Sequence, residues 1–283
     1  MKGFLKKHPN LTIFLVVVIV ILVSLLYGFY IAQEEAFFIP NHDEKAYNYL
    51  KTHDEFEEVH ITENGLDLYG WIKSIDKEEK KPLVIMYLGN AQCTANFFAN
   101  GFFFDYLEGY NVLAVDYPKY GLSKGKITEK ELFKSVLAVY DYGKSLGYVD
   151  GDNICVLGYS IGTGMATYVA SQRDVNGLML IAPYDNALNL YNDNINIFYG
   201  PLAAITRYKL ESDKYAKYVN VKPLIFATKN DEVINYSHAE ELAKKFKEVE
   251  ELIMFDEPSH GDIVVTEKVW IEIQNYLQER LVK

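Results

Sequence analysis

The 283 residues are enough for one large α/β domain with an additional segment, and a hydrophobic content of 49% supplies material for a core. The formal net charge is −11, and the basic residues before position 33 are Lys2, Lys6 and Lys7, so the rest of the chain carries 25 basic and 39 acidic residues. That excess of acid would be repelled by phosphate backbones, which excludes nucleic acid as an expected partner. Cys93 and Cys155 have no metal-ligand spacing, and a disulfide is neither required nor excluded.

The first element in the chain is an uncharged apolar run from Leu11 to Ala32. As a helix at about 1.5 Å per residue, it is long enough to cross the ~30 Å hydrocarbon core of a bilayer, and it is apolar on all sides. Tyr27 and Tyr30 fall where an interfacial aromatic belt is expected. The lysines before the run predict that residues 1–10 form a short cytoplasmic tail and that the rest of the chain lies across the membrane.

A cleaved signal peptide is the main alternative for this segment. The run is longer than a usual signal-peptide core, and no small-x-small cleavage site stands out between Tyr27 and Ala36. The sequence therefore favours an uncleaved transmembrane anchor at 11–32, followed by a connector at 33–55.

Two kinds of strand pattern follow the connector. Between Phe56 and Ser74, alternating runs flank Glu63-Asn64-Gly65, and Asn-Gly between strands indicates a hairpin at an antiparallel sheet edge. Continuous apolar runs, typical of strands buried on both faces, come next at Pro82–Leu88, Tyr110–Val115, Ile154–Leu157, Gly177–Ala182, Lys222–Thr228 and Glu251–Phe255. Helical segments alternate with them at Thr128–Leu146, Ile161–Gln172, Ser237–Glu248 and Thr266–Leu281. The pattern predicts an α/β domain over 56–283, with a mostly parallel, doubly wound sheet.

One segment, 184–220, breaks this alternation because it is too long for a simple helical connection. It is rich in Tyr, Asn and Leu, which fits a small cap over a ligand site with an apolar acyl pocket. One ordinary helix with irregular flanks fits the same residues, and the sequence leaves both interpretations open.

The strongest chemical signal is Gly158-Tyr159-Ser160-Ile161-Gly162, a G-x-S-x-G pattern between a buried strand and a helix. The tight turn exposes the Ser160 hydroxyl and points the Ile161 N–H towards a developing oxyanion. A glycine-rich turn without chemistry has the same local pattern, so the signal needs partners elsewhere in the chain.

Those partners are a base and an acid at later strand ends. His260 follows the Glu251–Phe255 strand and is the only histidine at such a position. Asp231 follows the strand before it, while neighbouring Glu232 is expected to point elsewhere and Asp185 is the competing position. The order Ser160, Asp231, His260 suits a triad in this topology. A second oxyanion donor is expected after the Pro82–Leu88 strand, where the Asn90 N–H is the candidate and Ala91 the substitute.

Several motifs together resemble the α/β-hydrolase superfamily: L-G-N-A (88–91), D-Y-P-K-Y-G-L-S-K-G (116–125), G-Y-S-I-G-T-G-M-A (158–166), A-P-Y-D-N (182–186), N-D-E-V-I (230–234) and S-H-G-D (259–262). More narrowly, the chain is similar to single-span, membrane-anchored serine hydrolases with a His-Gly-Asn-Ala oxyanion loop. The resemblance implies a Ser160–Asp231–His260 triad and hydrolysis of acyl esters, thioesters or sometimes peptides. Leu88 departs from the usual His, and Tyr117-Pro118-Lys119 departs from the usual Tyr-Arg-Gly.

The expected function is a membrane-anchored serine hydrolase with a small-molecule or lipid-like acyl substrate. A peptidase of the same fold and a catalytically silent, membrane-tethered binding protein are the alternatives. Neither a metal-ligand cluster nor a dinucleotide-binding fingerprint occurs, so no cofactor is expected.

Overall fold

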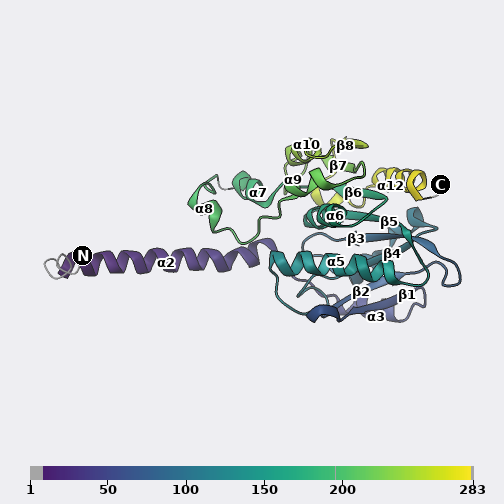
Figure 1. Cartoon of the computed structure of the whole chain (residues 1–283), viewed down its shortest axis with the longest axis horizontal. Helices are drawn as coiled ribbons and strands as arrows, with labels where there is room; N and C mark the ends of the chain where they lie inside the picture. The colour runs from purple at the N-terminus through teal and green to yellow at the C-terminus, as the bar shows by residue number, and fades with distance from the viewer. Residues whose placement is uncertain (1–8, 195, 282–283) are drawn as a thin grey trace.

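A long helix projects from an α/β body in the computed structural model, which describes residues 9–194 and 196–281 (Figure 1). This helix, α2 (Pro9–Phe37), has 29 residues, and none of its most apolar window is buried by the rest of the chain. Its length, about 43 Å, and its composition make it a candidate membrane span.

The helix continues past the expected end at Ala32, and a second helix, α3 (Glu44–Lys51), follows it. Asp43 caps α3 by accepting a hydrogen bond from the Ala46 N–H at 3.0 Å. The segment 33–55, expected as a connector, therefore holds the end of α2 and the whole of α3.

The body contains one eight-stranded sheet in the order β1-β2-β4-β3-β5-β6-β7-β8. Its strands are β1 (Phe56–Ile61), β2 (Leu68–Lys73), β3 (Lys81–Tyr87), β4 (Asn111–Val115), β5 (Val149–Tyr159), β6 (Gly177–Ile181), β7 (Leu224–Thr228) and β8 (Glu251–Phe255). β2 is antiparallel to β1 and to β4, and all remaining pairs are parallel. The predicted fold class, a mostly parallel sheet with an antiparallel N-terminal edge, is confirmed.

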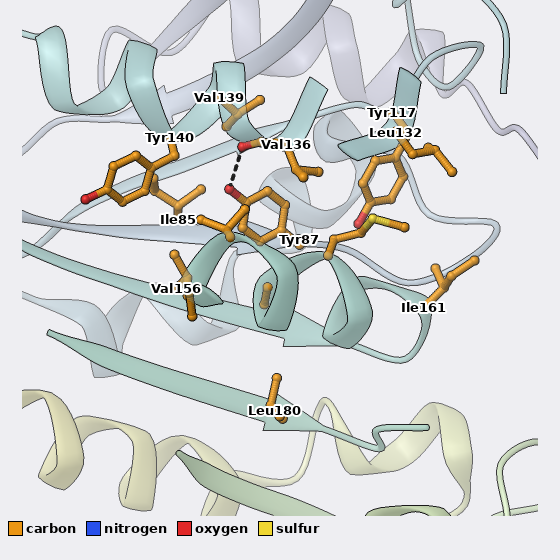
Figure 2. Packing of buried hydrophobic residues seen from close by; sticks show 14 of the residues in the cluster. Ile85, Tyr87, Tyr117, Leu132, Val136, Val139, Tyr140, Val156, Ile161 and Leu180 are labelled. Carbon is orange, nitrogen blue, oxygen red and sulfur yellow. Dashed lines mark hydrogen bonds between the residues drawn. The ribbon is translucent and has the colours of Figure 1, made fainter. Parts of the chain in front are cut away.

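Helices cover both faces of the sheet because its central strands are apolar on both sides. Along β3, Leu83 and Tyr87 pack in one buried cluster, while Val84 and Met86 pack in the other. The first cluster lies under α5 (Glu129–Ser145), α6 (Ile161–Gln172) and α10 (Ser237–Ala243). The second lies under α3, α4 (Thr94–Asn100), the 3-10 helix η2 (Phe102–Leu107) and α12 (Glu267–Leu281). In Figure 2 the buried Tyr87 hydroxyl donates to the Val136 carbonyl of α5 at 3.0 Å, so its polar end is satisfied.

Residues 184–220 are called the cap segment below, and the described ones, all but residue 195, form neither one long helix nor a strand. They contain α7 (Ala187–Asn194), α8 (Pro201–Ala204), α9 (Ser212–Tyr215) and the 3-10 helix η3 (Ala216–Tyr218). In Figure 1, α7 and α8 lie on the side of the body from which α2 projects. The described part of the segment thus holds one helix of eight residues, α7, and three shorter helices, and its role as a cap stays a prediction.

A buried carboxyl group at the end of β4 predicts how stability depends on pH. Asp116 accepts hydrogen bonds from the Thr94 N–H at 2.7 Å and from the Thr94 hydroxyl at 3.0 Å, but burial outweighs them and raises its pKa to about 7. In the unfolded chain the pKa of Asp is about 3.9. At pH values between these two pKa values, the Asp116 carboxyl group is protonated in the folded protein and ionised in the unfolded chain. The contribution of this group to the free energy of unfolding therefore falls as the pH rises through that window.

We expect Asp116→Asn to become more stable relative to the wild type as the pH rises from about 5 to about 8, because Asn keeps an acceptor oxygen without titrating. The midpoint of guanidinium unfolding in detergent, measured at both pH values, checks this. If the unfolding midpoints of variant and wild type differ by the same amount at both pH values, this expectation is contradicted.

Candidate active site

Ser160 lies at a sharp turn between β5 and α6. Its backbone has φ 52° and ψ −122°, a region that non-glycine residues rarely occupy and that costs about 1–3 kcal/mol. The flanking glycines allow the turn because side chains would collide there. A Cβ on Gly162 would lie 2.0 Å from the Tyr87 carbonyl oxygen, and one on Gly158 would lie 2.5 Å from the Gly162 carbonyl oxygen. The strained turn is thus held by close backbone packing.

Gly162→Ala tests that packing. We expect it to lower the free energy of unfolding by more than about 3 kcal/mol, because the Tyr87 backbone cannot move aside as a flexible side chain could. Gly147→Ala is the matched control, since Gly147 is exposed and a Cβ there meets no atom within 4 Å. Equal unfolding midpoints for the two variants in guanidinium would show that the turn tolerates a side chain.

The structure brings Ser160, His260 and Asp231 together. His260 begins the short helix α11 (His260–Ile263) after β8, and its Nε2 lies 2.9 Å from the Ser160 Oγ. Its Nδ1 lies 2.8 Å from the Asp231 Oδ2, in the loop after β7. The other carboxylate oxygen of Asp231 accepts hydrogen bonds from the backbone N–H groups of Val233 (2.9 Å) and Ile234 (2.7 Å). These bonds fix the orientation of the Asp231 carboxylate.

Two further residues hold His260, and sequence reasoning missed both. The Tyr159 hydroxyl donates to the His260 carbonyl at 2.9 Å, and the two rings stack with centroids 5.5 Å apart. The Glu232 carboxylate accepts a hydrogen bond from the His260 N–H at 3.0 Å. Glu232 was expected to point elsewhere than the triad acid, and its carboxylate contacts the backbone of His260 and not the ring.

Asp185, the other candidate for the acid of the triad, contacts a different histidine. Its Oδ1 is 2.6 Å from the Nδ1 of His238, and the Nε2 of the same ring is 2.7 Å from the Asp193 Oδ2 in α7. Burial opposes charge in both groups, but hydrogen bonding outweighs it: the pKa of Asp185 is lowered and that of His238 is raised. An ion pair here links the cap segment to α10 and leaves Asp231 as the partner of His260.

The candidate oxyanion donors lie at the same cavity as Ser160. Asn90 and Ile161 line one cavity with Ser160, and neither backbone N–H has an acceptor within the described part of the chain. The Ala91 N–H, in contrast, donates to the Asn90 Oδ1 at 3.0 Å. Of the two candidate oxyanion donors in this loop, the Asn90 N–H is therefore the one with no hydrogen-bond acceptor in the described part of the chain.

The loop around Asn90 is fixed without a histidine at position 88. The Asn90 Oδ1 also accepts hydrogen bonds from the Tyr120 hydroxyl at 2.7 Å and from the Ile39 N–H at 2.8 Å. The Tyr117 hydroxyl donates to the Leu88 carbonyl at 3.0 Å. Tyr117, in the segment that departs from Tyr-Arg-Gly, and Tyr120, directly after that segment, thus hold the loop.

The cavity above Ser160 has a volume of about 480 Å³. It is mostly apolar, and its remaining lining comes from α2, the cap segment and the loop after Asp231: Phe29, Ala32, Gln33, Phe37, Tyr184, Leu190, Tyr191, Phe198, Val233 and Ile234. Its size is in the usual range for small-molecule sites. Among the described residues, no cluster of His, Cys, Asp and Glu could hold a metal ion.

Comparison with known proteins agrees with this architecture. Residues 82–218 match the family described as alpha/beta hydrolase fold. The chain is 28% identical over 153 residues to the alpha/beta hydrolase domain-containing protein aho-3 of Caenorhabditis elegans, a match that covers 54% of this chain and 44% of that protein. It is 25% identical over 173 residues to the alpha/beta hydrolase domain-containing protein 17C of Xenopus tropicalis, covering 60% and 53%.

An esterase from Pyrococcus furiosus has a similar structure, with a TM-score of 0.65 and 20% identity over 86% of this chain and 98% of that one. The chain therefore has the α/β-hydrolase fold. It spans about half the length of the curated relatives it matches.

Proposed function

We propose that this protein is a membrane-anchored serine hydrolase that cleaves acyl esters or thioesters. The observation that carries the proposal is the continuous chain of contacts from the Ser160 Oγ through both ring nitrogens of His260 to Asp231. An α/β-hydrolase fold, relatives named for that domain and an esterase of similar structure add support. The apolar cavity at Ser160 fits the acyl part of such a substrate.

In this proposal each residue has a role in the chemistry. Ser160 attacks the acyl carbonyl while His260 takes its proton, and Asp231 keeps the ring in the right tautomer and stabilises the imidazolium. The N–H groups of Ile161 and Asn90 bind the oxyanion, and the loss of one such donor typically costs about 2.7–4 kcal/mol of transition-state stabilisation. His260 then protonates the leaving group, and water, activated by the same ring, releases the acyl group from Ser160.

A substrate panel tests this function on the purified full-length protein. We expect p-nitrophenyl esters and acyl thioesters to be hydrolysed, with kcat/KM rising from acetate to longer acyl chains because the cavity is apolar. An aminopeptidase substrate is included as the comparison. Turnover of the peptide substrate alone would contradict an acyl esterase and favour a peptidase.

We also propose that α2 stays in the mature protein as its anchor, with the N-terminus in the cytoplasm and the hydrolase domain on the far side. The uncharged span and the lysines before it support this orientation. The protein should remain in the membrane after carbonate extraction, and protease added outside intact cells or spheroplasts should digest the domain. Release by carbonate at full length would contradict the anchor, and protection from protease would contradict the orientation.

A further inference from the structure

The membrane helix forms part of the wall of the catalytic cavity. Phe29, Ala32, Gln33 and Phe37 lie on one face of α2 and line the same cavity as Ser160. The rings of Phe29 and Phe198 stack at 5.6 Å, and those of Phe37 and Tyr191 meet edge to face at 4.4 Å. The end of α2 is therefore packed against the cap segment as part of the site.

Polar contacts fasten this end of α2 to the body. The side chain of Gln33, 2% exposed, donates to the Ile205 carbonyl at 3.3 Å and accepts from the Arg207 N–H at 2.7 Å. Glu34 forms ion pairs with Lys119 and with Arg207, the latter at 2.9 Å. The side-chain amide of Gln33 thus binds two backbone groups of the cap segment. These contacts fix the orientation of the end of α2 relative to the cavity.

The anchor proposed above would place the cavity at the depth of the membrane boundary. About 20 helical residues span the ~30 Å hydrocarbon core, so a span that begins near Leu11 ends near Tyr30, between Phe29 and Ala32. In Figure 1, α7 and α8 lie on the side of the body from which α2 projects. Around these helices the cap segment exposes Ile197 (53%), Tyr199 (60%) and Leu202 (37%). Exposed apolar side chains of this kind are favourable in the headgroup and upper acyl region.

We propose that the substrate is the acyl ester of a membrane lipid, whose chain enters the cavity sideways from the leaflet between α2 and the cap segment. This inference rests on the proposed function of Ser160. The acyl C–O bond of the lipid breaks as the Ser160 Oγ–acyl bond forms, and His260 passes the serine proton to the leaving lipid alkoxide. Water then cleaves the acyl-serine bond, which yields a fatty acid and free Ser160.

Monooleoylglycerol in vesicles of ether-linked phosphatidylcholine tests this route, because the carrier lipid has no ester to cleave. The full-length protein is reconstituted in these vesicles, and oleate release is measured. We expect the rate to follow the fraction of monooleoylglycerol in the bilayer. We expect Ala32→Trp to lower it about ten-fold or more, since a Trp at this wall fills the cavity and a mismatch of a few methylenes is worth that much.

The matched control is Ile31→Trp, one position along α2 but 46% exposed and outside the cavity lining, which should keep the wild-type rate. Equal effects of the two variants would overturn lateral entry past α2. Faster cleavage of an S-acylated peptide in the same vesicles would overturn a lipid as the substrate class. Soluble p-nitrophenyl butyrate distinguishes the lipid inference from the proposed hydrolase function. Cleavage of this ester without cleavage of the lipid overturns only the lipid inference. Cleavage of neither substrate contradicts the proposed function.

Discussion

Ser160→Ala should lower kcat for p-nitrophenyl butyrate by about a million-fold, because the variant loses the nucleophile and leaves His260 without its hydrogen-bond partner. Only cavity binding and the oxyanion donors would remain to accelerate the reaction with water. The measurement is steady-state hydrolysis by the purified full-length protein, with circular dichroism to verify folding.

Ser171→Ala is the control for this substitution. Ser171 lies in the same helix, α6, and its hydroxyl donates to the Tyr168 carbonyl far from the cavity lining. It should keep the wild-type kcat. A fall of less than about ten-fold for Ser160→Ala would mean that another group performs the attack.

Asp231→Asn should lower kcat by about 10⁴-fold with little change in the fold, because an amide no longer stabilises the imidazolium and favours the wrong ring tautomer. Asp185→Asn is the discriminating control, since both carboxylates follow strands of the sheet and both contact a histidine. Its partner is His238, which does not touch Ser160, so its kcat should stay within a few-fold of the wild type. A larger loss for Asp185→Asn than for Asp231→Asn would reverse the assignment of the acid.

The hydrogen-bonded set Ser160, Asp231 and His260 could be predicted from the sequence because each residue follows an apolar strand. The carboxyl ends of parallel strands meet at one edge of a sheet, so position along the chain fixes position in space. The nucleophile turn has, in addition, a local signature, since only glycine fits where Gly162 meets the Tyr87 carbonyl. The fold class followed from the same alternation of strands and helices.

The contacts that support His260 could not be predicted in this way. Tyr159 and Glu232 both bind backbone atoms of His260. Every residue has a backbone N–H or carbonyl group of this kind, so the residue type at position 260 does not indicate such a contact. The contacts of His238 with Asp185 and Asp193 were also hidden, because α10 is far along the sequence from both aspartates. Nothing local distinguishes such a buried ion pair from a turn aspartate and a helix-start histidine.

The participation of α2 in the cavity is the largest difference between the sequence and the structure. An apolar run predicts a membrane span by its length, but hydropathy does not distinguish a side chain that faces lipid from one that faces a cavity. Gln33 and Glu34 were the available signal, because polar residues at the end of a span that pair with the body indicate a fixed contact. Two residues of the expected connector at 33–55, Gln33 and Phe37, therefore line the cavity.

The most direct test of a serine hydrolase is covalent labelling of the full-length protein by a fluorophosphonate probe, with the labelled residue located by peptide mass spectrometry. We expect one modified site, Ser160, and no labelling of Ser160→Ala or of denatured protein. Labelling that persists in Ser160→Ala, or native protein that remains unlabelled, would contradict a serine hydrolase that uses Ser160.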